Sequence, residues 1–215
     1  MDTEEYMKLI DLSHVIDNNM PVYPGDSPAY LTRDKYLQSD GFNHHRLATG
    51  THTGTHIDAP MHLTDGRKYI NEYGLDIFCG TAKVLDVTGE PVITYRNSFD
   101  DWIQKNDIVL FYTGHDEKYG TGGYFTDHPA LDMNMVEFLV EKKVRLIGLD
   151  MPSPDHHPFP VHRKLLENDI LIIENLRNLK ELRDKTIRLY AFPLNIRADA
   201  SIVRVVAEII PAPAG

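Results

Sequence analysis

The sequence is poor in cysteine, in net positive charge and in long apolar runs. Its single cysteine, Cys79, excludes an intramolecular disulfide and a cysteine-rich zinc site, so a metal ion must be held by nitrogen and oxygen atoms. The formal net charge of -10 argues against nucleic acid and anionic membrane surfaces as partners, because both require clustered lysine and arginine. Small-molecule partners are therefore favoured.

Nothing in the sequence predicts a membrane protein or a secreted protein. No apolar run approaches the roughly 20 residues that a membrane-spanning helix needs. The first residues, MDTEEYMKLIDL, are acidic and lack the basic flank, apolar stretch and small-residue cleavage site of a signal peptide. The chain is long enough to bury a substantial core, and no linker, repeat or low-complexity tract divides it. We therefore expect one domain over residues 1–215, in the cytoplasm.

Short β-branched runs recur along the chain and predict a strand-rich α/β fold. The expected strands cover residues 8–16, 80–88, 107–114, 144–151, 169–176, 186–196 and 201–210. Several of these runs are apolar on both faces, as in a sheet that is covered on both sides. Helical patterns cover residues 133–143 and 161–169. The strand, helix, strand order over 107–151 implies a crossover, whereas the other connections look too short for one, so the sheet is expected to be mixed.

Residues 51–62 read THTGTHIDAPMH and contain a dense group of metal-binding residue types. Four of them lie at even spacings of four, two and four positions: His52, His56, Asp58 and His62. In an extended segment such side chains point to the same face, and Gly54 and Pro60 disfavour a helix here. Two imidazoles and one carboxylate form a half-open ligand set suited to Zn²⁺ or Mn²⁺. The alternative, a strand whose threonines and histidines merely cover a surface, explains the clustering less well.

Asp58 and His62 have chemical properties that extend this hypothesis. A carboxylate has two oxygens, so Asp58 is able to bridge two cations that lie about 3.5–4 Å apart. His62 lies at the end of the segment, where it faces the site without necessarily binding a cation. Because imidazole titrates near neutral pH, His62 is a candidate general acid or base.

Ligands for a second cation are expected in VHRKLLENDILIIENL, residues 161–176. Glu174 interrupts an apolar strand, where a buried carboxylate is costly unless it is paired or bound to a cation. An exposed position on an edge strand explains Glu174 equally well from sequence alone. His162 opens a short helical stretch, from which a histidine commonly faces solvent. Asp150 is a candidate to accept the second ring proton of a ligand histidine.

The segment HTGTHIDAPMH resembles the signature of the cyclase-like metal hydrolases, a family that includes bacterial kynurenine formamidases. Further similarity lies in DLSHVIDNNMPVYPGD, LIGLDMPSPD and VHRKLLENDILIIENL, and these stretches cover most of the chain in the expected order. The resemblance implies a swivelling β/β/α fold with a mixed, strand-rich core, and a homodimer. One departure is Ala200, where relatives usually have glycine before the serine.

The same resemblance implies an activity and a set of site residues. His52, His56 and Asp58 would hold one divalent cation, Asp58, His162 and Glu174 would hold the second, and His62 would be the catalytic acid/base. Zn²⁺ is the expected cation and Mn²⁺ the alternative. The expected reaction is hydrolysis of N-formyl-L-kynurenine to L-kynurenine and formate by metal-activated water.

Two other functions stay open at this point. One is hydrolysis of a cyclic amide such as isatin, and the other is a protein that binds metal without catalysis. The aromatic wall of a substrate pocket is equally undecided among four residues: Trp102, Tyr23, Phe42 and Phe159.

Overall fold

The computed structural model describes residues 8–211. The strands in this range are β1 (Leu9–Asp11), β2 (Tyr30–Lys35), β3 (His44–Ala48), β4 (His56–Asp58), β5 (Cys79–Asp86), β6 (Val92–Ile93), β7 (Ile108–Tyr112), β8 (Ala130–Leu131), β9 (Leu146–Leu149), β10 (Leu171–Glu174), β11 (Ile187–Tyr190), β12 (Ala200–Ile202) and β13 (Val206–Ile209). The α-helices are α1 (Leu37–Asp40), α2 (Met133–Glu141) and α3 (Pro160–Glu167). Short 3-10 helices cover Pro60–His62, Ile70–Glu72, Leu75–Phe78, Asn97–Phe99, His115–Lys118 and Leu179–Leu182.

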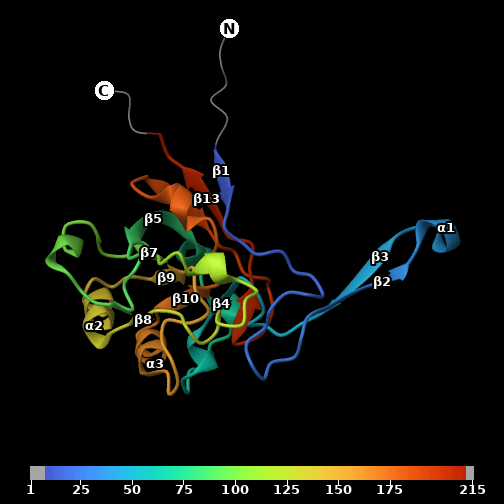
Figure 1. Cartoon of the computed structure of the whole chain (residues 1–215), viewed down its shortest axis with the longest axis horizontal. Coiled ribbons are helices and arrows are strands. Elements are labelled where there is room, and N and C mark those ends of the chain that lie inside the picture. Colours follow the sequence, from blue (N-terminus) through green and yellow to red (C-terminus); the bar gives the residue numbers. More distant parts are fainter. Residues whose placement is uncertain (1–7, 212–215) are drawn as a thin grey trace, which may run out of the picture.

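Over residues 8–211, nine strands form one sheet in the order β1-β13-β11-β5-β7-β9-β10-β4-β12 (Figure 1). The central strands β5, β7, β9 and β10 are parallel to their neighbours in that group. Antiparallel strands flank them on both sides, with β11, β13 and β1 on one side and β4 and β12 on the other. The mixed α/β sheet predicted from the sequence is therefore confirmed.

The crossover predicted over residues 107–151 is also confirmed, since α2 connects the parallel strands β7 and β9. The expectation that the other connections are too short for a crossover is wrong. Helix α3 connects the parallel strands β9 and β10, and residues 87–107 connect the parallel strands β5 and β7 with little helical structure.

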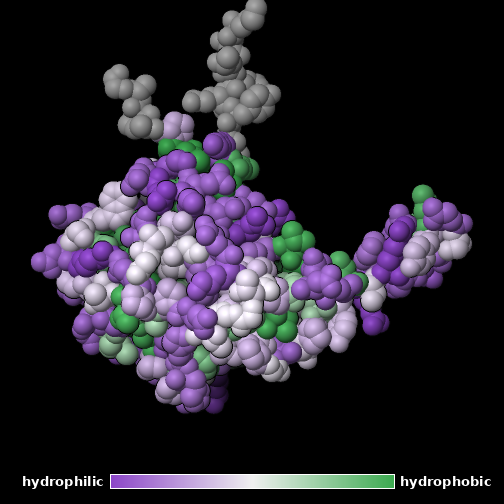
Figure 2. Space-filling model, in the orientation of Figure 1, coloured by the Kyte–Doolittle hydropathy of each residue, from purple (hydrophilic) through white to green (hydrophobic). Residues whose placement is uncertain are grey.

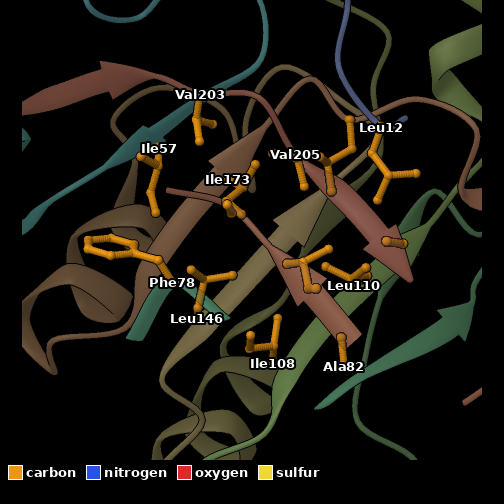
Figure 3. Packing of buried hydrophobic residues seen from close by; sticks show 14 of the residues in the cluster. Leu12, Ile57, Phe78, Ala82, Ile108, Leu110, Leu146, Ile173, Val203 and Val205 are labelled. Atoms are coloured by element: carbon orange, nitrogen blue, oxygen red, sulfur yellow. The ribbon is translucent and has the colours of Figure 1, made fainter. Parts of the chain in front are cut away.

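Both faces of the central strands are buried. Along β7, Ile108 and Leu110 belong to one apolar cluster, whereas Val109 and Phe111 belong to the other, as alternation along a strand requires. Helices α2 and α3 cover the second cluster, and Asp132 caps α2 by accepting a hydrogen bond from the backbone N–H of Met135 at 2.9 Å. The first cluster is formed with the antiparallel strands and the loops beside them (Figure 3).

The observed strands are shorter than the apolar runs that predicted them. The run 201–210 is divided, because β12 pairs with β4 at one edge of the sheet, whereas β13 pairs with β11 and β1 at the other side. Among residues 8–211, no helix is both long and apolar enough to cross a membrane. Residues 1–7, which make up most of the acidic N-terminal stretch MDTEEYMKLIDL, lie outside the described residues.

The hairpin of β2 and β3 was not predicted, because its residues are polar and largely exposed. It projects away from the rest of the fold, with α1 at its tip (Figure 1). Its surface is mixed in hydropathy (Figure 2). Large exposed apolar side chains lie along it and at its tip: Tyr30, Tyr36, Leu37, Phe42 and Leu47.

Candidate metal centre

Strand β4 places two of the candidate ligands on one face. It lies between β10 and β12, with His56 directly opposite Glu174. Ile57 and Ile173, the next opposite pair, point into the apolar core (Figure 3). Because side chains alternate along a strand and opposite residues share a face, His56 and Glu174 both point away from that core. His56 Nε2 lies 3.4 Å from Glu174 Oε2.

Glu174 is therefore buried in the sheet, with 5% of its surface exposed. The reading that places it on an exposed edge strand is wrong, because β10 pairs with β9 and β4. His162 is likewise buried in the first turn of α3, with 4% exposed, and does not face solvent.

The extended segment expected over residues 51–62 is wrong outside β4. Gly54 has a φ of +61°, a left-handed conformation that favours glycine and turns the chain so that His52 returns to the site. Pro60 begins a 3-10 helix that carries His62. The four side chains still converge, but a turn and a helical turn bring them together instead of one continuous strand.

The carboxylate of Asp58 lies at the centre of the group. Its Oδ1 atom is 2.8 Å from His52 Nδ1 and 3.4 Å from His56 Nε2. Its Oδ2 atom is 3.2 Å from His162 Nε2. Glu174 Oε1 lies 3.9 Å from the same nitrogen of His162. The two oxygens of Asp58 therefore face two different sets of nitrogen and oxygen atoms.

Hydrogen bonds orient His56 toward this centre. Its Nδ1 atom donates to the carbonyl oxygen of Gly54 at 2.8 Å, which leaves the Nε2 lone pair for the site. The same carbonyl accepts a hydrogen bond from Asn175 Nδ2 at 3.0 Å. Asn175 Oδ1 in turn accepts from the hydroxyl of the buried Tyr124 at 2.7 Å. These contacts form a continuous chain of hydrogen bonds from His56 to Tyr124.

The buried charges fit a cation. Among the described residues, Asp58 Oδ1 and Glu174 Oε1 are buried without a hydrogen-bond donor aligned to them. Two adjacent buried carboxylates are costly unless positive charge lies nearby. Three overlapping groups have ligand atoms within 4.8 Å of one another: His52, His56 and Asp58; Asp58, His62 and His162; and His52, His62 and Asp199.

The electrostatics of the group show how strongly its members interact. Burial alone would lower the pKa of His52, but the carboxylates of Asp58 and Asp199 raise it to about 10. Burial alone would raise the pKa of Asp58, but the adjacent His56 and His52 hold it well below its usual range. Burial raises the pKa of Glu174. A cation must therefore displace protons from the histidines, so its binding should depend on pH.

His62 differs from the other histidines. Burial, together with the neighbouring His52 and His162, lowers its pKa, so the ring is neutral near pH 7. Its ring centroid lies 4.0 Å from that of His52 and 5.5 Å from that of His162. A neutral imidazole in this position is able to accept a proton.

A cavity of about 240 Å³ opens onto these residues. Aromatic side chains on its wall are Tyr23, Tyr119, Phe125 and Phe159. Of the four aromatic candidates from the sequence, Tyr23 and Phe159 line the cavity, whereas Trp102 and Phe42 are exposed elsewhere. The group at the floor of the cavity is thus accessible to a small molecule.

Two further aspartates, Asp150 and Asp199, lie outside the expected ligand set. Asp150 accepts hydrogen bonds from the backbone N–H groups of Thr113 and Gly114 and from the Thr113 hydroxyl, so the prediction that it supports a ligand histidine is wrong. Asp199, which was not predicted, lies against His52 and His62. Asp199 directly precedes the short apolar strand β12, and no local sequence pattern distinguishes it from the other aspartates of the chain.

Comparison with known proteins agrees with this arrangement. The Cyclase family model matches residues 10–156. A kynurenine formamidase from Bacillus cereus is 32% identical over 212 residues, covering 96% of this chain and 98% of its own length. One from Geobacillus thermodenitrificans is 34% identical over 205 residues, covering 91% and 94%. The chain therefore belongs to the cyclase family. It is a hydrolase that acts on an amide C–N bond.

Solved structures show the same fold. Isatin hydrolase A from Ralstonia solanacearum has a TM-score of 0.85 at 23% identity, covering 95% of this chain and 92% of its own. A protein from Bacillus stearothermophilus, described as a predicted metal-dependent hydrolase, has a TM-score of 0.79 at 28% identity, covering 94% and 98%.

Proposed function

We propose that the chain is a metal-dependent formamidase that hydrolyses N-formyl-L-kynurenine to L-kynurenine and formate. The observation that carries this proposal is that the two oxygens of the Asp58 carboxylate face different histidines. Oδ1 faces His52 and His56, and Oδ2 faces His162. This arrangement suits two divalent cations that share one carboxylate. The kynurenine formamidases that match along nearly the whole chain support the choice of substrate.

In this proposal His52, His56 and Asp58 hold one cation, and Asp58, His162 and Glu174 hold the other. The nitrogen and oxygen donors suit Zn²⁺, with Mn²⁺ as the alternative. Asp58 Oδ1 and Glu174 Oε1, which are buried without an aligned hydrogen-bond donor, support this assignment, because a cation would compensate their charge. When bound, the cations supply a Lewis acid and a water of lowered pKa.

His62 is the proposed acid/base. Because burial keeps its ring neutral, it is able to take a proton from the attacking water and return it to the departing nitrogen. General acid/base catalysis of this kind contributes about 10²–10⁴-fold to a rate.

The cavity wall favours an aryl amide. Phe125, Phe159 and Tyr23 offer apolar surface for an aromatic ring, while Asn175 and Ser153 offer polar atoms at the same cavity. Since the ligand set is adjacent to this cavity, the site is not enclosed as in a purely structural metal site. This accessibility favours catalysis over metal storage.

A homodimer remains part of the proposal. The projecting hairpin exposes Tyr36, Leu37 and Phe42, which a second copy of the chain would cover. Light scattering of the purified protein tests this, and Leu37→Lys combined with Phe42→Lys should shift a dimer to monomer. A wild-type mass of 24.6 kDa in solution would contradict it.

A cytoplasmic location also stays a prediction.

The decisive experiment combines metal analysis of the purified protein with hydrolysis assays on N-formyl-L-kynurenine and on isatin. We expect bound zinc or manganese and activity on the formamide. His62→Ala should retain metal but lose turnover by about 10²–10⁴-fold, whereas Asp58→Asn should release metal. Activity on isatin alone would favour the cyclic-amide alternative. Chelation that unfolds the protein, with no hydrolysis of either compound, would favour the non-catalytic one.

A further inference from the structure

Asp199 is held rigidly next to the candidate metal centre. It immediately precedes β12, whose first residue, Ala200, pairs with Asp58. The carbonyl oxygen of Asp199 accepts a hydrogen bond from the backbone N–H of Ala59 at 2.9 Å. These backbone contacts tie Asp199 to the turn that follows β4. The position of its carboxylate relative to the site is therefore set by the sheet.

The carboxylate contacts both histidines that flank it. Asp199 Oδ2 lies 2.9 Å from His52 Nε2 and 3.5 Å from His62 Nδ1. Its Oδ1 atom accepts from the hydroxyl of Thr51 at 3.4 Å. The side chain is 35% exposed, so it lies at the periphery of the site and not at its buried centre.

The two contacts show which ring nitrogen of His52 and which of His62 faces Asp199. His52 Nε2 faces Asp199, and its Nδ1 faces Asp58 Oδ1 at 2.8 Å. A proton held on Nε2 by a carboxylate leaves the lone pair on Nδ1 for a cation. His62 Nδ1 faces the same carboxylate oxygen at 3.5 Å, which is longer than an ordinary hydrogen bond, so Asp199 attracts this ring less tightly and leaves its Nε2 for proton exchange.

We propose that Asp199 is a positioning residue that orients His52 for metal binding and His62 for proton transfer. This proposal rests on the proposed function, because it assigns those roles to the two histidines. One carboxylate oxygen serves both rings, so the orientations of the ligand and of the acid/base are coupled. Asp199 itself touches neither the cations nor the substrate in this scheme.

The rival role for Asp199 is that of a further metal ligand. Its carboxylate, His52 and His62 form one of the groups whose ligand atoms lie within 4.8 Å of one another. However, the contact to His52 is made at Nε2, on the opposite side of the ring from the nitrogen that faces Asp58. The number of bound cations per chain distinguishes the two roles.

The test uses Asp199→Ala and Asp199→Asn, with Asp65→Asn as a matched control. Asp65 is an exposed aspartate near the site in sequence. Zinc affinity is measured by competition with a chromophoric chelator, and kcat and KM are measured on N-formyl-L-kynurenine at saturating zinc. We expect Asp199→Ala to lose about 10–100-fold in zinc affinity and in kcat, with a smaller change in KM. The number of zinc ions bound at saturation should equal that of the wild type.

Asp199→Asn keeps an oxygen that accepts a hydrogen bond from His52, so it should recover much of the zinc affinity. Nitrogen-15 spectra of the zinc-loaded wild type should show the His52 proton on Nε2. Unchanged affinity and kcat in Asp199→Ala would overturn the proposal, and so would the loss of one zinc ion per chain at saturation. If the wild type does not hydrolyse the formamide, the proposed function fails, while zinc affinity and the ring spectra still test Asp199.

Discussion

Tyr124→Phe removes one oxygen atom from the network that orients His56. Tyr124 is fully buried, and its hydroxyl donates to Asn175 Oδ1 at 2.7 Å. The amide of Asn175 donates to the Gly54 carbonyl at 3.0 Å, and His56 Nδ1 donates to the same carbonyl at 2.8 Å. In the variant the aromatic ring remains, but Asn175 Oδ1 loses its donor in a residue that is 5% exposed.

The expected loss of stability follows from that single unpaired acceptor. Leaving a buried acceptor unsatisfied costs about 1–3 kcal/mol. For a chain of this size, each kcal/mol lowers Tm by about 2–4 °C, so Tm should fall by about 2–12 °C. Urea denaturation of metal-free protein should show a lower midpoint with an unchanged m value, since the exposed surface does not change. Zinc affinity should fall as well, because His56 is less firmly oriented.

Tyr190→Phe is the control. Its hydroxyl bonds Glu208 at 2.7 Å on the outer strands, where water is able to replace the lost partner. We expect a change below about 0.5 kcal/mol. If Tyr124→Phe denatures at the same urea concentration as the wild type, or costs no more than Tyr190→Phe, the reasoning about the buried network is refuted.

Three further predictions concern the turn, the pH response and the metal. Gly54→Ala should lose about 1–2 kcal/mol from left-handed backbone strain, whereas the new Cβ, 2.6 Å from Met20 Cε, meets only the flexible end of that side chain; equal stability in denaturation would contradict it. Burial lowers the pKa of His128 from 6.5 to about 4, so the unfolded chain gains a proton first and stability is lost as pH falls through that range. His128→Gln should therefore lose about 2 kcal/mol less than the wild type between pH 7 and pH 5, and equal losses would sink the assignment. Zinc at about 100 times its Kd should stabilise the protein by about 2.7 kcal/mol, or about 5–11 °C in Tm, and Asp58→Asn should abolish the gain in a thermal melt.

The sequence predicted the ligand candidates better than their local structure. Alternation correctly placed His56 and Asp58 on one face, because these residues lie within a real strand. It did not describe His52 and His62, because Gly54 reverses the chain before β4 and Pro60 starts a helical turn after it. Both departures depend on single residues whose preferred conformations interrupt a periodic pattern.

Other features could not be read from the sequence because they arise only from tertiary packing. Asp199 is far from residues 51–62 along the chain, and the pairing of β12 with β4 brings it beside them. The hairpin of β2 and β3 has little buried surface, so no apolar alternation marked it. Glu174 was ambiguous because its neighbours in the sheet, and not its own segment, decide whether it is buried.

The three residues of strand β4 point alternately to two regions of the protein. His56 and Asp58 point into the site, and Ile57 points into the apolar core. Attempts to make this enzyme more heat-resistant by repacking the interior around Ile57 should consequently displace the side chains of His56 and Asp58 on either side of it. The effects of substitutions at Ile57 and at His56 or Asp58 should therefore be strongly non-additive. Directed evolution for thermal stability is therefore better aimed at α2 and the apolar cluster that it covers, away from β4.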